Sequence, residues 1–173
     1  RLAEVVRQRG WTEDSIVVNV QGDEPLMPIA NIKQVARELI EHPEASIATL
    51  SELLASAEQL DDPSVVKVVA SMSGNALYFS RAAIPFQRDQ TEKSSSLLLA
   101  AARRHIGLYA YRAAFLQAFA AWPPSVMETL ESLEQLRALD QGHIIRICEA
   151  SEPVPAGVDT PEDLERARGL LVG

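Results

Sequence analysis

The feature that most limits how this chain can fold is a short apolar run that ends at two acids and a proline. Residues 16–20 read IVVNV, and residues 21–25 read QGDEP. The apolar run lacks helical spacing and is typical of a buried β-strand. Pro25 disfavours continuation of the strand, so Asp23 and Glu24 are expected at its carboxyl end, where open α/β sheets bind ligands. Asp23 is therefore a candidate metal ligand, although a solvated acidic turn gives the same pattern.

A helix is predicted directly after this turn, over residues 28–41. Pro28 suits the first helical turn, and apolar residues recur at the spacing of one helix face. Strand, turn and helix together form a βα unit. Further strands are predicted at residues 45–50, 105–111 and 144–148, and a β-hairpin at residues 65–80. A hairpin inside an α/β chain indicates a sheet of mixed direction.

Additional helices are predicted at residues 1–7, 115–122 and 127–139, and after Pro161. The helix over residues 127–139 is expected to bury a stripe formed by Leu130, Leu133, Leu136 and Leu139. Residues 81–96 are expected to form a loop. We interpret residues 1–173 as a single domain. Because residues 1–7 have neither an initiator Met nor a capping residue before them, we expect the chain to begin within the fold.

Charge and cysteine content exclude several classes of protein. The formal net charge is −8, and no run of five or more Lys or Arg occurs, which argues against binding to nucleic acid or to anionic membranes. Cys148 is the only cysteine, so neither an internal disulfide nor a cysteine zinc site is possible. There is no apolar stretch of eighteen residues and no secretion signal. These features favour a cytoplasmic location.

A second acid stands directly before a helix, at Asp159 in the run GVDTPEDL. A Mg²⁺ ion that bridges a nucleotide phosphate needs only one or two carboxylates, and its other positions hold water or phosphate oxygens. Asp23 and Asp159 together satisfy that need. Thr160 and Asp163 form a variant of the capping box, and Asp159 is also compatible with a simple role as a helix cap.

Several other polar side chains are candidates for contact with a substrate. Arg81 and Arg88 lie in the predicted polar loop, and the arginine fork suits carboxylates and phosphates. His105 opens a predicted strand, and Tyr109 and Glu134 could face the same side. Each has a plain alternative: solvated surface arginines, a histidine satisfied at a strand end, and a glutamate at the edge of an apolar stripe.

Seven segments of the chain, in order, closely resemble the bacterial 3-deoxy-manno-octulosonate cytidylyltransferases, or CMP-Kdo synthetases. These are RLAEVV, VNVQGDEP, VKVV, ALYFSRAAIPFQRD, RHIGLYAYR, LESLEQLR and GVDTPEDLERAR, and they run from Arg1 to about Arg168. The resemblance implies a three-layer α/β/α sandwich of the nucleotide-diphospho-sugar transferase type, with a mixed, mainly parallel sheet. It also implies a homodimer that uses Mg²⁺ to convert CTP and the acid sugar Kdo into CMP-Kdo and pyrophosphate, for lipopolysaccharide biosynthesis.

The resemblance also implies roles for individual residues. Asp23 and Asp159 match the acids that bind Mg²⁺ while the anomeric hydroxyl of the sugar attacks the α-phosphorus of CTP. The residues that match the sugar pocket are Gln21, Arg81, Arg88, His105, Tyr109, Glu134 and, more weakly, Gln135. The arginines suit the carboxylate of Kdo, and the other residues suit its hydroxyl groups.

The chain departs from this family at two places. A strand and loop of the type PARxxSxRLPGKPL, which hold the CTP triphosphate, do not occur in residues 1–173. The tract at residues 91–102 is also richer in Ser and Ala than the acidic loop of the family. We therefore expect residues 1–173 alone to show no cytidylyl transfer. Two alternatives remain: a CMP-transferase for another acid sugar, and a truncated, inactive module for binding or dimerisation.

Overall fold

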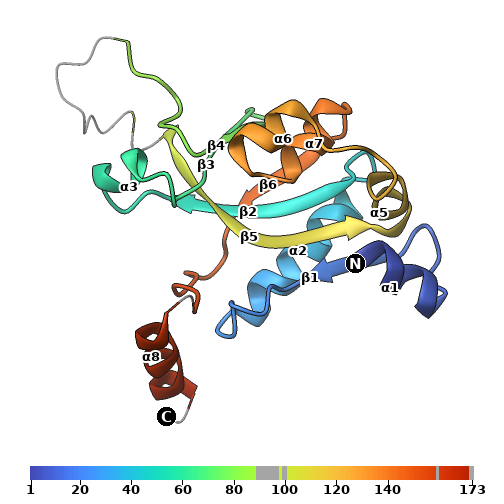
Figure 1. Cartoon of the computed structure of the whole chain (residues 1–173), viewed down its shortest axis with the longest axis horizontal. Helices are drawn as coiled ribbons and strands as arrows, with labels where there is room; N and C mark the ends of the chain where they lie inside the picture. Colours follow the sequence, from blue (N-terminus) through green and yellow to red (C-terminus); the bar gives the residue numbers. More distant parts are fainter. Residues whose placement is uncertain (89–97, 99–100, 159, 172–173) are drawn as a thin grey trace.

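The computed structural model describes residues 1–88, 98, 101–158 and 160–171, and in that part six strands form one sheet (Figure 1). The strands are β1 (Ile16–Asn19), β2 (Ile47–Leu53), β3 (Lys67–Ala70), β4 (Ala76–Ser80), β5 (Arg103–Arg112) and β6 (Ile145–Glu149). The helices are α1 (Leu2–Arg9), α2 (Ile29–Glu41), α3 (Ala57–Asp61), α5 (Ala113–Phe119), α6 (Val126–Glu131), α7 (Gln135–Asp140) and α8 (Pro161–Leu171). No helix in these ranges is long and apolar enough to cross a membrane.

The sheet is of mixed direction, as the sequence predicts. Its order is β4-β3-β5-β2-β6, and β1 also pairs with β5. Strand β5 is antiparallel to β1, β2 and β3, whereas β2 and β6 are parallel. Strands β1, β2, β3 and β6 therefore point the same way. Because β5 separates β1 and β3 from β2, the pair of β2 and β6 is the only parallel one among the described strands. The described pairs are therefore mainly antiparallel, and the mainly parallel sheet that the resemblance implies is not found in this part of the chain.

Two strands share one edge of β5 and leave a gap between them. Strand β3 pairs with Arg103 and Arg104 at one end of β5, and β1 pairs with residues 109–112 at the other. Strand β2 occupies the opposite edge of β5. The backbone around Gly107 therefore has no neighbouring strand on the β1–β3 side, which leaves it accessible to side chains.

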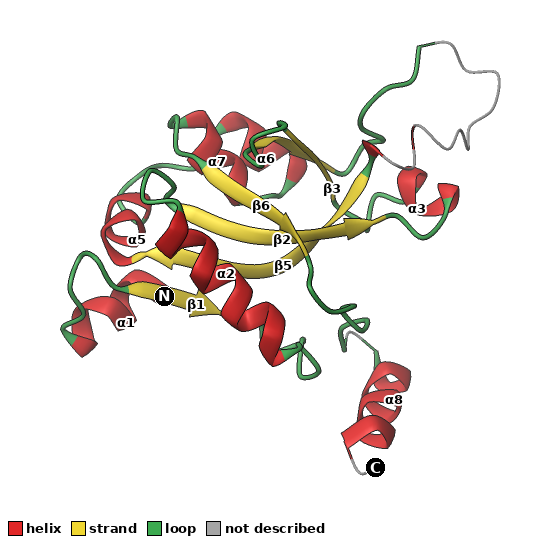
Figure 2. Cartoon of the chain, turned by 180° about the vertical axis from the view of Figure 1, so that it is seen from behind, coloured by secondary structure: helices red, strands yellow, loops and turns green. Residues whose placement is uncertain are grey.

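Helices cover both faces of the sheet, which gives the three-layer arrangement expected (Figure 2). On one face, α2 packs its fully buried Val35 and Leu39 against Leu50 and Leu108. The other face is covered by α6 and α7. There Phe79 of β4 and Tyr109 of β5 join a second core, together with Leu133, Leu136 and Ile145. The burial of α2 follows its apolar stripe, except that Ile40 is 69% exposed.

The prediction of one helix over residues 127–139 is wrong. Ser132 adopts a left-handed conformation, with φ of 53°, and ends α6. A second helix, α7, begins at Gln135, with Glu134 as its N-cap residue. The break moves Leu130 out of the buried stripe, and its side chain is 80% exposed. A non-glycine residue rarely adopts this conformation, so no local sequence pattern indicates the break.

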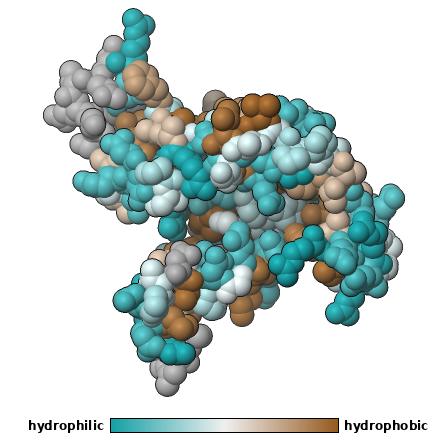
Figure 3. Space-filling model, viewed as in Figure 1, coloured by the Kyte–Doolittle hydropathy of each residue, from teal (hydrophilic) through white to brown (hydrophobic). Residues whose placement is uncertain are grey.

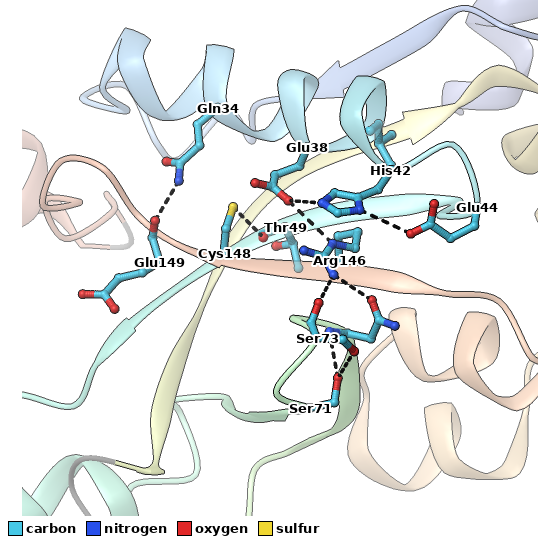
Figure 4. Close-up of polar contacts among 12 residues, drawn as sticks. Gln34, Glu38, His42, Glu44, Thr49, Ser71, Ser73, Arg146, Cys148 and Glu149 are labelled. Atoms are coloured by element: carbon cyan, nitrogen blue, oxygen red, sulfur yellow. Dashed lines mark hydrogen bonds and ion pairs between the residues drawn. The ribbon is translucent and has the colours of Figure 1, made fainter.

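A polar network joins the turn of the β3–β4 hairpin to β6 and α2 (Figure 4). Arg146 on β6 donates from Nη1 to the carbonyl oxygen of Ser73 and, over 3.0 Å, to Oδ1 of Asn75. Its Nε lies 3.6 Å from Oε2 of Glu38 on α2. The backbone N–H of Ile147 donates to the carbonyl oxygen of Gly74 over 2.8 Å. The hairpin therefore reaches across one face of the sheet as far as β6.

Gly74→Ala is expected to lower the free energy of unfolding by about 1–2 kcal/mol. Gly74 has φ of +79°, and an added Cβ would lie 2.8 Å from Nη2 of Arg146. Urea unfolding of the chain measures the effect. Gly169→Ala is the matched control, because Gly169 lies in α8 and an added Cβ there meets no atom within 4 Å. Equal stability of the two variants would contradict the prediction.

Candidate functional site

The candidate site is built around a bulge in β5. Thr49 of β2 pairs with Tyr109, but the next residue, Leu50, pairs with Ile106, so residues 107–108 of β5 have no partner on β2. Two extra residues preserve the alternation of side chains between the faces of the sheet. In a regular strand His105 and Tyr109 would be about 13 Å apart. Here their ring centroids are 5.3 Å apart, because the bulge shortens the path between them. Such bulges often re-aim side chains beside active sites.

Gly107 makes room for Gln21 at this bulge. The side-chain amide of Gln21 donates from Nε2 to the carbonyl oxygen of Gly107 over 3.2 Å. A Cβ at Gly107 would lie 3.1 Å from the same nitrogen, so a larger residue would push the amide away. This contact crosses the gap between β1 and β3. It brings the turn after β1 onto the same part of the sheet as His105 and Tyr109.

His105 is held by Thr49 and by aromatic rings. Nε2 of His105 lies 2.9 Å from the hydroxyl oxygen of Thr49. The ring of Phe79 meets the imidazole edge-on, with 5.0 Å between centroids and an interplanar angle of 82°. Burial, and then the positive charge of Arg104, lower the pKa of His105 to about 3. His105 is therefore neutral at physiological pH.

Tyr109 is a buried, neutral phenol. Burial, followed by the effects of Tyr111 and Glu134, raises the pKa of Tyr109 well above its usual value. The carboxylate of Glu134 is thus close enough to act on this ring, while Glu134 itself is exposed at the start of α7. Gln135, the next residue, is buried, and its Nε2 has no hydrogen-bond partner among the described residues. A buried unpaired donor is costly, and a ligand acceptor would satisfy it.

Asp23 lies in the exposed turn that follows β1. Its backbone carbonyl oxygen accepts a hydrogen bond of 2.8 Å from the N–H of Val158. This contact brings the chain just before α8 against the acidic turn. Its carboxylate makes no hydrogen bond or ion pair with the described part of the chain, so both oxygens are available to a ligand. Asp159, the other predicted metal ligand, lies outside the described residues.

Arg81 is fixed mainly by backbone carbonyl groups. Its Nε donates to the carbonyl oxygen of Glu131 over 2.8 Å, and its Nη1 donates to that of Pro63 over 2.9 Å. The Glu131 carboxylate accepts the backbone N–H of Arg81 over 2.9 Å. Lys67, which is fully buried, donates from Nζ to the carbonyl oxygens of Arg81, over 2.6 Å, and Asp62, over 2.7 Å. Two of the guanidinium nitrogens are therefore occupied, and no described residue binds Nη2, which leaves it for a ligand.

The structure brings together some of the predicted site residues and leaves others apart. Gln21, His105 and Tyr109 meet at the bulge, with Glu134 acting on Tyr109. Arg81 is anchored to Glu131, at the end of α6. Arg88 is exposed and lies next to residues 89–97, which are outside the described part. A role for Arg88 stays a prediction.

Three residues that the sequence analysis did not select support the site. Thr49 binds His105, Lys67 holds the backbone at Arg81, and Ser51 carries a buried hydroxyl group without a partner in the described residues. Their only sequence signal is polarity inside strands. Thr49 and Ser51 alternate with apolar residues in β2, and Lys67 is flanked by valines.

Comparison with known proteins places the chain in a family. Residues 1–147 match the family described as Cytidylyltransferase. The chain belongs to the cytidylyltransferase family. This result confirms the family resemblance that the sequence motifs indicate.

Curated relatives within the family are named 3-deoxy-manno-octulosonate cytidylyltransferase. The relative from Stenotrophomonas maltophilia (strain K279a) is 52% identical over 173 residues, which cover 99% of this chain and 67% of the relative. That from Pseudomonas syringae pv. tomato is 54% identical over 99% of this chain and 68% of the relative. That from Acinetobacter baumannii (strain AYE) is 48% identical over 99% of this chain and 68% of the relative.

A solved structure agrees with these sequence relationships. CMP:2-keto-3-deoxy-manno-octonic acid synthetase complexed with CTP has a TM-score of 0.85 and 37% sequence identity to this chain. The match covers 99% of this chain and 66% of that structure. The cytidylyltransferase chain described here thus spans about two thirds of the length of the proteins it matches. The predicted α/β fold with a mixed sheet is confirmed.

Proposed function

We propose that this chain is part of a cytidylyltransferase that activates Kdo with CTP, giving CMP-Kdo and pyrophosphate for lipopolysaccharide biosynthesis. The observation that carries the proposal is the meeting of Gln21, His105 and Tyr109 at the β5 bulge, with Asp23 two residues from Gln21. The names of the curated relatives supply the sugar, and the solved complex supplies CTP. Neutral polar groups beside an acidic turn suit a hydroxyl-rich sugar that must approach a metal-bound nucleotide.

The acidic turn fits Mg²⁺. Asp23 offers an exposed carboxylate that the described residues leave unengaged. No cluster of three or more potential metal ligands occurs in the described ranges. Mg²⁺ needs no such cluster, since one or two carboxylates suffice when phosphate and water oxygens complete its coordination. We propose Asp23 and Asp159 as these carboxylates, and the hydrogen bond from Val158 to the backbone of Asp23 supports the pair. A bound Mg²⁺ supplies charge neutralisation at the α-phosphate and favours ionisation of the attacking hydroxyl group.

The side chains around the bulge position the sugar. Gln21 is fixed on Gly107 through its amide nitrogen, and its amide oxygen, which no described residue contacts by a hydrogen bond, can accept from a hydroxyl group. Tyr109, kept neutral by burial, retains a phenolic proton to donate. Arg81 is the proposed partner of the sugar carboxylate through Nη2, with Arg88 as a second cation. Glu134 and Gln135, at the start of α7, complete the proposed pocket.

The test uses a chimera in which this chain replaces the matching 173 residues of the Stenotrophomonas maltophilia relative. With CTP, Kdo and Mg²⁺, we expect the chimera to form CMP-Kdo and release pyrophosphate. Residues 1–173 alone are expected to give no transfer and serve as the control. A chimera that folds but transfers CMP to a different acid sugar and not to Kdo would overturn the substrate assignment.

We also propose that the protein is a homodimer and is cytoplasmic. Leu77 on β4 is 62% exposed, and on α6 Val126 is 76% and Leu130 80% exposed. Figure 3 shows an apolar patch over α6, at the top of that view. Leu130→Glu is expected to turn the dimer into a monomer in light scattering; a dimer unaffected by this change would exclude the α6 face. The free thiol of Cys148 suits a reducing compartment.

A further inference from the structure

The hydroxyl group of Thr49 has three polar neighbours, and they determine which nitrogen of His105 carries a proton. Thr49 is fully buried in β2. Its Oγ1 lies 2.9 Å from Nε2 of His105, 2.9 Å from the carbonyl oxygen of Ile106, and 2.8 Å from that of Leu108. Leu108 lies in the bulge of β5, and Ile106 borders it. Thr49 therefore stabilises the bulge and contacts the imidazole with the same atom.

A count of protons assigns the direction of each hydrogen bond. A hydroxyl group has one proton to donate and two lone pairs to accept with, whereas a carbonyl oxygen only accepts. If Thr49 donated to His105, both carbonyl oxygens would face Oγ1 at hydrogen-bond distance without a proton between them. The proton of Thr49 must therefore point to these carbonyl oxygens. Nε2 of His105 must then be the donor to Thr49.

We propose that Thr49 is a positioning residue that fixes His105 as the tautomer protonated at Nε2, so that Nδ1 accepts a hydrogen bond from a hydroxyl group of the acid sugar. The identity of the sugar rests on the proposed function. The tautomer rests on the geometry of Thr49 alone. Within the described residues Nδ1 makes no hydrogen bond, so it is available to a ligand.

With this tautomer, His105 and Arg81 recognise different groups of the sugar: His105 a hydroxyl group and Arg81 the carboxylate. The low pKa of His105, about 3, means that its ring carries a single proton at neutral pH. With that proton on Nε2, Nδ1 presents a lone pair, which attracts an O–H donor and repels a carboxylate. The rings of Phe79 and Tyr109 pack against the imidazole, with centroids 5.0 and 5.3 Å away. His105 therefore selects a hydroxyl group, and the carboxylate is left to the cationic side of the site.

The tautomer can be measured without substrate by two-bond ¹H–¹⁵N correlation spectra of the ¹⁵N-labelled chain. The chain has only three histidines, His42, His105 and His143, and a His105→Gln variant identifies the signals of His105. We expect Nε2 in the range of protonated nitrogen and Nδ1 in the range of unprotonated nitrogen. Protonation at Nδ1 in the unmodified chain would overturn the proposal.

Two substitutions at Thr49 separate the hydroxyl group from the shape of the side chain. Thr49→Ser keeps the hydroxyl group and should keep the tautomer. Thr49→Val keeps the shape but removes the acceptor for Nε2–H, so we expect the spectrum to move toward the Nδ1–H form. A Thr49→Val spectrum identical to that of the unmodified chain would overturn the proposal. If Thr49→Val does not fold, the unmodified chain and Thr49→Ser still decide the tautomer.

Kinetics of the chimera test the contact with the sugar. Thr49→Val should raise KM for Kdo about tenfold, which corresponds to the loss of one hydrogen bond to the sugar. KM for CTP should remain unchanged. Thr49→Ser should keep both constants. No rise, or an equal rise in both constants, would overturn the sugar contact. A chimera that forms no CMP-Kdo would overturn the proposed function, while the spectra would still decide the tautomer.

Discussion

Asp23→Asn in the chimera should lower the rate of CMP-Kdo formation on the order of a thousandfold, because the loss of a metal-binding carboxylate removes stabilisation of the transferring phosphate. The substitution preserves size and leaves the backbone carbonyl group of Asp23 free to accept from Val158. The fold should therefore be unchanged, as measured by circular dichroism. The decisive measurement is the release of pyrophosphate as Mg²⁺ is varied.

A matched control separates the charge of Asp23 from the general acidity of the turn. Glu13 is exposed and lies before β1, away from the turn at residues 21–25. Glu13→Gln removes the same charge from the chain and should leave the rate unchanged. If Asp23→Asn kept the rate and the Mg²⁺ dependence of the unmodified chimera, Asp23 would not be a metal ligand.

Arg137→Met should lower the free energy of unfolding by about 3 kcal/mol, because it leaves the carboxylate of Glu128 buried without its partner. The Arg137 guanidinium donates to both oxygens of Glu128, over 2.7 and 2.6 Å. The two side chains are only 13% and 11% exposed. Arg137 also donates to the carbonyl oxygen of Trp122 over 3.0 Å and stacks 4.2 Å from the ring centre of Phe119. This pair therefore joins α5, α6 and α7.

The exposed pair Arg168 and Glu165 in α8 is the matched control, with side chains 63% and 69% exposed. Arg168→Met should change the free energy of unfolding by less than about 0.5 kcal/mol. The double variant Glu128→Gln with Arg137→Met should recover part of the loss, because neither charge is then buried alone. Equal effects of Arg137→Met and Arg168→Met in urea unfolding would show that the buried pair is not stabilising.

The same pair gives a dependence of stability on pH. Burial alone would raise the pKa of Glu128, but hydrogen bonds from Arg137 and from the N–H of Ser125 outweigh it, and the net effect lowers the pKa below 4.5. A lowered pKa in the folded state stabilises the fold above the pKa of the unfolded state. The contribution of Glu128 should be complete at neutral pH. It should decline as the pH falls below 4.5 toward the pKa of the folded state.

Local sequence patterns predicted those parts of the fold that depend on neighbouring residues. The run of β1, the acidic turn and α2 was predictable because apolar spacing and Pro25 act within a few residues. The hairpin of β3 and β4 was predictable from its turn, whose Gly74 adopts a positive φ. The break between α6 and α7 was not, because Ser132 adopts a left-handed conformation without a local glycine signal.

The candidate site shows the same limit. The sequence singled out His105 and Tyr109, and the resemblance to a family indicated the sugar pocket. Neither predicted the bulge that brings their rings together, because it depends on how β5 pairs with β2. Thr49 was overlooked for that reason. A threonine in a strand is unremarkable until its partners in a distant strand are known.

The central place of β5 has a consequence for biosynthesis. Strand β5 pairs with β1, β2 and β3, and it ends at Arg112. These three strands therefore all leave the ribosome before β5 does. Pairings between such distant segments form slowly, because a long loop must close first. Until then the three earlier strands expose unpaired edges to other nascent chains. Chaperone capture is therefore expected to matter most while synthesis passes from residue 70 to residue 112.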